Sequence, residues 1–377
     1  MFKIFKVIII NILVLFIFLK IADYSIKKIE FNKRYKNSQN YELQQKESYI
    51  KKINEKLFAD AKIKNFKTYV YPFLYDYGAL KKIAEEYSIA PLGLEPKKSY
   101  FYCNEGYGLK TFTTDRFGFV NDDKLWDKKK QFDILLISDS FGLSSCVKES
   151  NSIDSIIKKQ NLSIINLSHG GNDPYIYASL IKSFQNISYK NLVIMFYSND
   201  NQIKNNNNIF YQIYFKKNQN YLDNNFNLNP NLKKVYEKTN NILKQEKSNF
   251  LPDIFIFKKK KIFLEEIKNF FNFPYLKSYL SFYLKFYNNV PFSTKLTIEE
   301  AEKICILPKC KIHVVYINPS TFWRYDLASD KYSKSLADYL KKKKINFLNT
   351  NDIFSPDNEE NYAPYGPHLS ISGYKKL

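Results

Sequence analysis

Histidine and cysteine are scarce in this chain of 377 residues, which has only three histidines and four cysteines. A structural zinc site needs four such ligands grouped closely. Cys305, Cys310 and His313 would supply half of one, but no second ligand pair follows them in the sequence. We therefore expect no bound metal, and we also expect no cofactor.

Recognised nucleic-acid-binding motifs are also absent, although the net charge is +21. A strongly basic chain can bind nucleic acid or an anionic membrane surface. Here the lysines are spread along the whole sequence and form runs only at Lys258–Lys261 and Lys341–Lys344. A solvated basic surface explains this distribution, so we expect no nucleic-acid partner.

No signal-peptide cleavage site follows the apolar N-terminal run, Val7–Leu19, because Lys20 stands where a small residue would be needed. The run is short for a membrane-spanning helix, which needs about 20 residues, but snorkelling of Lys6 and Lys20 would lengthen it. We predict an uncleaved membrane anchor over residues 1–22 and export of the remainder. A buried helix of a cytosolic protein is the alternative, and the flanking charges do not decide the orientation.

The remaining chain divides by composition. Residues 23–97 are polar with helical spacing and predict a stalk or cap, and residues 201–296, rich in Asn and Lys and then in Phe and Tyr, predict a helical insertion. Residues 98–200 and 297–377 contain five apolar runs separated by helix-like stretches, which favours a parallel α/β sheet. Right-handed crossovers would make it a three-layer α/β/α sandwich with five parallel strands. The runs are Phe132–Ile137, Ser163–Leu167, Leu192–Tyr197, Ile312–Ile317 and Ile345–Leu348.

Four short polar blocks stand just past predicted strands or near the C-terminus. They are Ser138-Asp-Ser-Phe141, Asn166-Leu-Ser-His-Gly-Gly171, Ser198-Asn-Asp200 and Gly366-Pro-His-Leu-Ser-Ile-Ser-Gly-Tyr374. The carboxyl ends of parallel strands are where ligands bind in α/β sheets. Acyl transfer needs these residue types, because a serine must lose its proton to a histidine and the oxyanion needs preorganised donors. A serine that merely caps the next helix is the alternative for the first block.

In this order and spacing, the four blocks resemble the SGNH (GDSL-type) hydrolases, and they most resemble a membrane-anchored bacterial branch linked to surface-polysaccharide O-acylation. The lead-in Thr114-Asp-Arg-Phe-Gly-Phe119 is also similar to that branch. The resemblance implies a flavodoxin-like fold with Ser140 as nucleophile and His368 as general base. It also implies an oxyanion hole formed by Ser140, Gly171 and Asn199.

Two positions depart from the family pattern. Ser138 replaces the glycine of the Gly-Asp-Ser-Phe block, and no acid stands two or three residues before His368, where this chain has Tyr365 and Gly366. Asp352 or Asp357 could supply the missing acid from the preceding loop. A backbone carbonyl could instead orient His368, or the site could be inactive.

The four cysteines allow three disulfide connectivities. We predict Cys103–Cys146, which would tie the lead-in to the segment after the nucleophile, and Cys305–Cys310, which would close a small loop before the fourth strand. The remaining histidine, His169, lies in the block that carries Gly171 and is a candidate for substrate contact.

The sequence thus predicts an exported serine ester hydrolase or O-acyltransferase, held at the inner membrane with its domain in the periplasm. The expected substrate is an acylated surface glycan or a small ester, the acyl group being acetyl. A catalytically inactive glycan-binding or scaffold protein on the same fold is the alternative. The sequence does not distinguish hydrolysis from transfer, and it indicates no particular protein partner.

Overall fold

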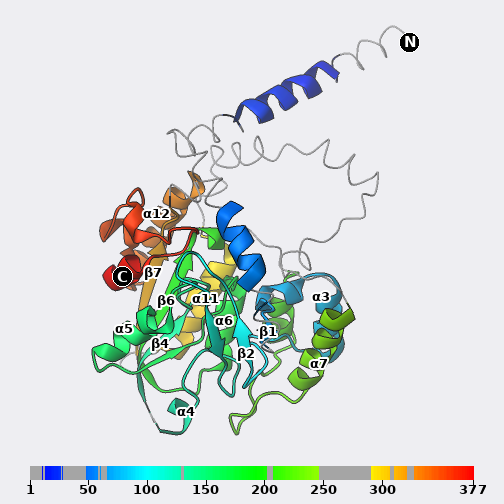
Figure 1. Cartoon of the computed structure of the whole chain (residues 1–377), viewed down its shortest axis with the longest axis vertical. Coiled ribbons are helices and arrows are strands. Elements are labelled where there is room, and N and C mark those ends of the chain that lie inside the picture. Colours follow the sequence, from blue (N-terminus) through cyan, green and yellow to red (C-terminus); the bar gives the residue numbers. More distant parts are fainter. Residues whose placement is uncertain are drawn as a thin grey trace.

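The structure is a computed structural model that describes residues 11, 13–26, 28, 48–57, 60, 66–128, 131–201, 207–245, 290–305, 310–320 and 327–377. Its central element is a parallel sheet with the strand order β5-β4-β6-β7-β8 (Figure 1). All five predicted strands are present, and the largest difference is at β6, which begins at Tyr189 instead of Leu192. The strands are β4 (Phe132–Ile137), β5 (Ile164–Asn166), β6 (Tyr189–Tyr197), β7 (Lys311–Ile317) and β8 (Asn346–Asn349).

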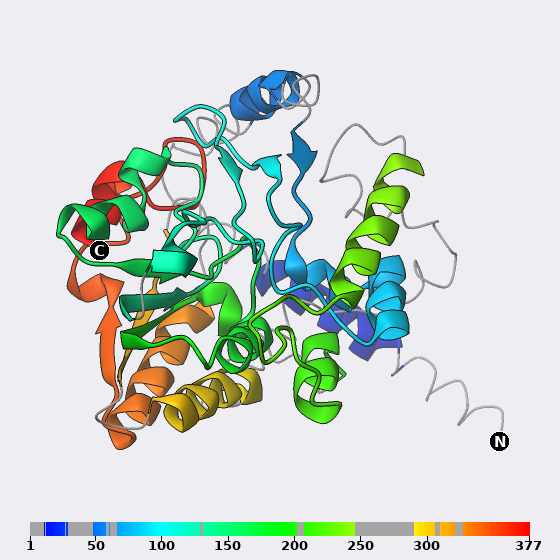
Figure 2. The same cartoon turned by 90° about the horizontal axis from the view of Figure 1, so that it is seen from below.

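Helices cover both faces of this sheet. Because side chains alternate along a strand, Leu135 and Ile137 enter one core while Leu136 enters the other. The first core is covered by α6 (Pro174–Ser183), α11 (Phe292–Ile304) and α12 (Leu327–Lys342), and the second by α5 (Ile153–Lys159) and α13 (Ile371–Lys376) (Figure 2). The predicted three-layer α/β/α arrangement is therefore present.

Local signals explain where two of these helices begin. Asp173 accepts hydrogen bonds from the N–H groups of Tyr175 and Ile176, and Pro174 occupies the first turn of α6. Ser152 caps α5 through the N–H of Ser155. Each cap ends the loop that follows a strand: Ser152 ends the loop after β4, and Asp173 ends the loop after β5. Both loops therefore leave the sheet at the carboxyl ends of these strands.

A second, three-stranded sheet precedes the main one. It consists of β1 (Lys67–Thr68), β2 (Ser99–Phe101) and β3 (Thr111–Thr113), in that order. β2 and β3 are antiparallel, and the segment that connects them, residues 102–110, is called the Glu105 loop below. α4 (Leu125–Lys128) then leads into β4.

The predicted cap and insertion pack together. The cap contributes η1 (Pro72–Asp76) and α3 (Gly78–Tyr87), and the insertion contributes the π-helix η4 (Tyr211–Lys216) and α7 (Asn231–Gln245). α3 packs on both η1 and α7. The aromatic stretch of the predicted insertion, residues 270–283, lies outside the described residues. Short 3₁₀ helices complete the fold: η2 (Glu149–Asn151), η3 (Ser198–Asn201), η5 (Thr350–Asp352) and η6 (Glu359–Asn361).

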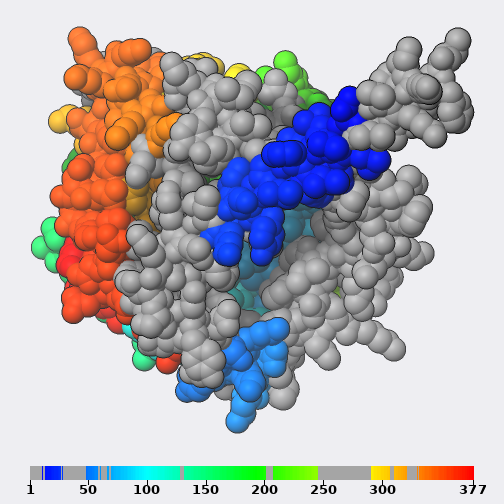
Figure 3. Space-filling view, turned by 90° about the horizontal axis from the view of Figure 1, so that it is seen from above, coloured from blue at the N-terminus to red at the C-terminus, as the bar shows by residue number. Residues whose placement is uncertain are grey.

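Part of the predicted membrane anchor is described, and it is helical over residues 13–26. This helix stands apart from the sheets in Figure 1 and is seen in front of the rest of the chain in Figure 3. Its apolar side chains are open to solvent, with Phe18 69% and Leu15 60% exposed. Within the described residues, no helix combines the length and the apolar character that crossing a membrane requires. The predicted membrane-spanning helix is thus not found in the described part of the chain.

Candidate functional site

Ser140 is the only partly exposed residue of the turn Ser138–Phe141, which follows β4. The carboxylate of Asp139 accepts a hydrogen bond from the N–H of Phe141 at 2.9 Å, which closes the turn. Ser138, where the family pattern has glycine, donates its hydroxyl to the carbonyl of Met195 on β6 at 3.0 Å. The turn is therefore closed by its own hydrogen bond and anchored to β6 through Ser138, and Ser140 is left as its one partly exposed residue.

His368 lies directly beside this hydroxyl. Its Nε2 is 2.9 Å from the Ser140 Oγ, and its Nδ1 is 2.7 Å from Oε1 of Glu105. A carboxylate only accepts hydrogen bonds, so Nδ1 carries the proton and Nε2 is free to accept from the serine. The structure thus brings together a hydroxyl, an imidazole and a carboxylate in the order required for nucleophilic catalysis.

The carboxylate that contacts His368 belongs to neither of the two predicted acids. Asp352 and Asp357 are exposed, and the partner of His368 is Glu105, which stands 263 residues earlier in the sequence. Glu105 also accepts the backbone N–H of His368 through Oε2 at 3.3 Å. The side chains of Glu105 and His368 are only 12% and 16% exposed, so the hydrogen bond between them is largely shielded from water.

The absence of an acid before His368 has a steric explanation. A Cβ atom added to Gly366 would lie 1.9 Å from Cδ of Glu105. The Glu105 carboxylate therefore fills the volume that the side chain of an aspartate at position 366 would need. The glycine and the distant glutamate together replace the expected acid.

A signal for Glu105 was present in the sequence. Glu105 stands two residues after Cys103, and the predicted Cys103–Cys146 disulfide is formed. That bridge alone brings the Glu105 loop to the segment following Ser140. The second predicted disulfide, Cys305–Cys310, is also formed.

Charges around His368 set its protonation. Burial by itself lowers the pKa of His368, but the negative charge and the hydrogen bond of Glu105 outweigh this effect and raise the pKa above its usual value. The charge of Asp139 acts in the same direction as Glu105. Burial also raises the pKa of Asp139 to about 6.

The predicted oxyanion-hole residues follow three adjacent strands. Ser140 follows β4, Gly171 follows β5 and Asn199 follows β6, so all three stand at the same edge of the sheet. Gly171 has a φ of +71°, a conformation that favours glycine, and a Cβ there would lie 2.5 Å from the ring of Phe73. Oδ1 of Asn199 is buried and has no hydrogen-bond partner among the described residues.

His169 does not face a substrate, because it is completely buried. Its Nε2 donates to the carbonyl of Gly118 at 2.9 Å, and its Nδ1 accepts the hydroxyl hydrogen of Tyr69 at 3.1 Å. The Tyr69 hydroxyl in turn accepts the N–H of Gly170 at 2.8 Å. Burial lowers the pKa of His169 to about 4. The predicted substrate contact is therefore wrong, and His169 supports the loop that carries Gly171.

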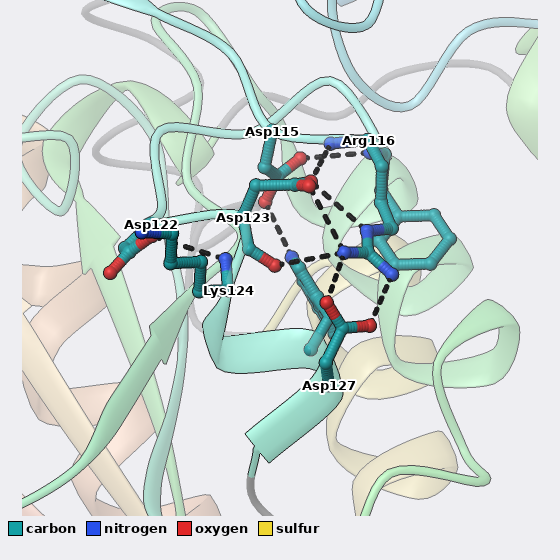
Figure 4. Close-up of polar contacts among 8 residues, drawn as sticks. Asp115, Arg116, Asp122, Asp123, Lys124 and Asp127 are labelled. Carbon is teal, nitrogen blue, oxygen red and sulfur yellow. Dashed lines mark hydrogen bonds and ion pairs between the residues drawn. The ribbon is translucent and has the colours of Figure 1, made fainter.

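The lead-in that includes Gly118 is itself rigidly braced. Asp115 is buried and accepts the N–H groups of Phe117 and Phe119, both at 2.9 Å. Arg116 forms ion pairs with Asp123 at 3.0 Å and Asp127 at 2.7 Å (Figure 4). These contacts hold the carbonyl of Gly118 where His169 can reach it.

Only one cluster of potential metal ligands is close enough to share an ion among the described residues. It consists of Glu105, Cys146 and His368, whose ligand atoms lie within 4.8 Å of one another. The sulfur of Cys146 is bound to Cys103 and is therefore not available as a thiolate. These residues form part of the site already described.

No protein-family model matches the chain, and no curated protein is similar to it. Among solved structures, it is similar to a protein from Desulfitobacterium hafniense DCB-2 that is assigned to the lipolytic G-D-S-L family. The identity is 13%, the match covers 66% of this chain and 94% of that one, and the TM-score is 0.32.

Proposed function

We propose that this protein is a serine ester hydrolase or O-acyltransferase whose reaction is carried by Ser140, His368 and Glu105. One observation carries the proposal: the two hydrogen bonds of 2.9 and 2.7 Å that join the three side chains in a row. A serine hydroxyl is a weak nucleophile until a neighbouring base accepts its proton, and a base works best when a third group orients it.

The first half of the reaction forms an acyl-enzyme. Nε2 of His368 takes the proton of Ser140 while Oγ attacks the ester carbonyl carbon. The carbonyl electrons move to oxygen, and the N–H groups of Ser140 and Gly171 with the amide of Asn199 stabilise the resulting oxyanion. The C–O bond to the alcohol then breaks, and His368 returns the proton to the leaving oxygen. Glu105 holds the proton on Nδ1 throughout.

The second half of the reaction releases the acyl group. His368 deprotonates either water or the hydroxyl of an acceptor, and that oxygen attacks the acyl carbon. The bond between the acyl carbon and Oγ of Ser140 then breaks, and His368 returns the proton to Oγ. Water as the attacking group gives hydrolysis and an acceptor hydroxyl gives transfer. Both outcomes use the same residues, so the site is equally suited to either.

We propose that the substrate is a surface glycan that carries short O-acyl groups, with acetyl as the expected acyl group. Two aromatic side chains near the proposed oxyanion hole support a small acyl site. Phe73 contacts Gly171, and Tyr71 lies against Gly170 and close to Glu105, whose charge adds to burial in raising the pKa of Tyr71 to about 12. Turnover of p-nitrophenyl acetate should therefore exceed that of the hexanoate ester, and faster hexanoate turnover would exclude a small acyl site.

An oxidising compartment, the periplasm, is the proposed location. The two disulfides support it, because such bonds persist outside the cytosol. The exposed apolar side chains of residues 13–26 support attachment to the inner membrane. Carbonate extraction of cell membranes would test that attachment, and release of the full chain into the soluble fraction would exclude it.

The decisive experiment is labelling with a fluorophosphonate probe together with p-nitrophenyl acetate turnover. Ser140→Ala should abolish labelling and lower kcat/KM by roughly 10³-fold or more, because the nucleophile is removed. Ser138→Ala is the matched control and should still be labelled. The hydroxyl of this buried neighbour is hydrogen-bonded to the carbonyl of Met195 and the carboxylate of Asp139, and to neither Ser140 nor His368. Unchanged turnover in Ser140→Ala would refute the proposed function.

A non-catalytic glycan-binding or scaffold role was suggested by two observations, the missing acid before His368 and Ser138 in place of a glycine. Glu105 supplies a carboxylate to His368, and Ser138 fits its position with a hydrogen bond to Met195, so neither observation still favours that role. Tight glycan binding combined with no labelling of the wild-type chain would restore it.

A further inference from the structure

The acid of the proposed site comes from a different part of the chain than the nucleophile and the base. Glu105 belongs to the loop between β2 and β3 of the small sheet, whereas Ser140 follows β4 of the main sheet. A carboxylate on a separate loop needs a dedicated attachment, because an error of about 1 Å in position can cost about 10²-fold in rate. The structure contains two such attachments at the same place.

The first attachment is the Cys103–Cys146 disulfide. Cys103 stands two residues before Glu105, and Cys146 stands six residues after Ser140. The sulfur of Cys146 is 4.0 Å from Nδ1 of His368, so the bridge lies directly beside the hydrogen bond between His368 and Glu105. Cys146 has a φ of +64°, a strained conformation for a residue other than glycine, which the bond to Cys103 helps to maintain.

The second attachment is the ammonium group of Lys110, at the other end of the Glu105 loop. Lys110 is only 8% exposed, and its Nζ donates to the carbonyls of Leu143 and Ser144 at 2.8 and 2.7 Å. Both carbonyls belong to the segment between Ser140 and Cys146. Burial lowers the pKa of Lys110 to about 8, which shows how far this cation has been withdrawn from water.

The loop between these two attachments is internally rigid. Asn104 Oδ1 accepts the N–H groups of Gly106 and Gly108, both at 3.0 Å. The N–H of Lys110 also donates to the carbonyl of Cys103 at 2.8 Å, which brings the two ends of the loop together. A displacement of Cys103 would therefore move Glu105 with it.

We propose that the Cys103–Cys146 disulfide, assisted by Lys110, is the positioning element that keeps Glu105 on His368, so that the reaction depends on the oxidation state of this one bond. The inference rests on the proposed function. A dithiol would reduce the bond, transferring two electrons and two protons to give two thiols while it becomes a disulfide itself. Cys103 is only partly buried, so a small dithiol can reach it.

The chain offers a matched control in its other disulfide. Cys305 follows α11 and Cys310 precedes β7, so this bridge lies at the amino edge of the sheet, opposite the site. Cys103→Ser/Cys146→Ser should lower kcat for p-nitrophenyl acetate by about 10²-fold with little change in KM. Cys305→Ser/Cys310→Ser should leave kcat and KM near wild type. Thermal unfolding of both variants shows whether each is folded at the assay temperature.

A double-mutant cycle separates positioning from a general loss of structure. If the disulfide acts through Glu105, then Glu105→Gln should cost little further activity in the Cys103→Ser/Cys146→Ser background. The cysteine variant should also shift the acidic limb of the pH profile to lower pH, as Glu105→Gln does. Additive losses, or a cysteine variant with wild-type kcat and pH profile, would overturn the inference.

A reversible version uses the single-disulfide chain Cys305→Ser/Cys310→Ser, in case the other variant does not fold. Titration with dithiothreitol should lower its activity, reoxidation should restore it, and circular dichroism should stay constant. Full activity after complete reduction, measured by thiol alkylation, would overturn the inference. The proposed function would survive that result as long as Ser140→Ala remained inactive.

Discussion

Two histidines lie near the same edge of the sheet, and their surroundings make them chemically opposite. His368 is paired with the carboxylate of Glu105, and its pKa is raised despite burial. His169 is hydrogen-bonded to a carbonyl and a tyrosine hydroxyl, and burial lowers its pKa to about 4. The charge of the partner therefore decides which imidazole can accept a proton at neutral pH and which is a neutral packing group.

Replacing Glu105 with an uncharged residue should have the largest effect, because it removes the difference between the surroundings of His368 and those of His169. Glu105→Gln gives His368 an uncharged neighbour, as His169 has, and the amide no longer secures the proton on Nδ1. We expect kcat to fall roughly 10²- to 10⁴-fold. Asp352→Asn changes an exposed acid at the end of η5 and should have no effect on p-nitrophenyl acetate turnover. A larger loss in Asp352→Asn than in Glu105→Gln would reverse the assignment of the acid.

The space shared by Gly366 and Glu105 provides the next test. Gly366→Ala places a methyl group against Cδ of Glu105 and should displace the carboxylate, with a loss of about 10²-fold in kcat. The double variant Glu105→Ala/Gly366→Asp returns an acid to the family position, two residues before His368. It should be measurably more active than Glu105→Ala alone, and equal activity would show that the two positions are not interchangeable.

The pH dependence gives a smaller but more specific effect. A general base must be neutral, so kcat/KM should rise with pH around a midpoint above 6.5, because Glu105 raises the pKa of His368. In Glu105→Gln the two largest raising effects are lost, while burial, which is the largest effect, still lowers the pKa of His368 and only the charge of Asp139 still raises it. The midpoint should therefore move to lower pH. An unchanged midpoint in the variant would show that another group titrates.

The same shift makes a prediction for stability. The pKa of His368 is higher in the folded protein than the value of about 6.5 expected in the unfolded chain. Its protonation therefore stabilises the folded state fully at pH values below about 6.5, and this stabilisation is lost as the pH rises through the pKa of the folded state. The stability advantage of the wild type over Glu105→Gln should therefore shrink with increasing pH. Thermal unfolding across that range measures it.

His169→Ala should have the smallest effect on the chemistry. It leaves the hydroxyl of Tyr69 and the carbonyl of Gly118 without their partner, and should cost about 2 to 4 kcal/mol of stability. The midpoint of the pH profile should stay in place, since this residue is already neutral in the working range. A shifted midpoint would mean that His169 takes part in the proton transfer.

Much of the fold was predictable from local patterns. The five apolar runs became the five strands, because buried parallel strands need continuous apolar segments that polar turns interrupt. Both predicted disulfides are formed, although four cysteines allow three connectivities and the sequence alone did not choose among them. The Ser140 turn and the loop with His368 followed from their place after strands and near the C-terminus.

The amino-acid sequence by itself thus determined the sheet, the order of its strands along the chain and the edge at which Ser140, Gly171 and Asn199 stand. Only the tertiary structure decided which acid meets His368 and which histidine remains neutral. Periodicity and spacing report what happens within about one strand–helix unit, whereas Glu105 and His368 are 263 residues apart. Their contact depends on a loop from a second sheet and on the space that Gly366 leaves for the Glu105 carboxylate. The one signal in the sequence, Cys103 two residues before Glu105, points to this loop only through a disulfide that closes in the tertiary structure.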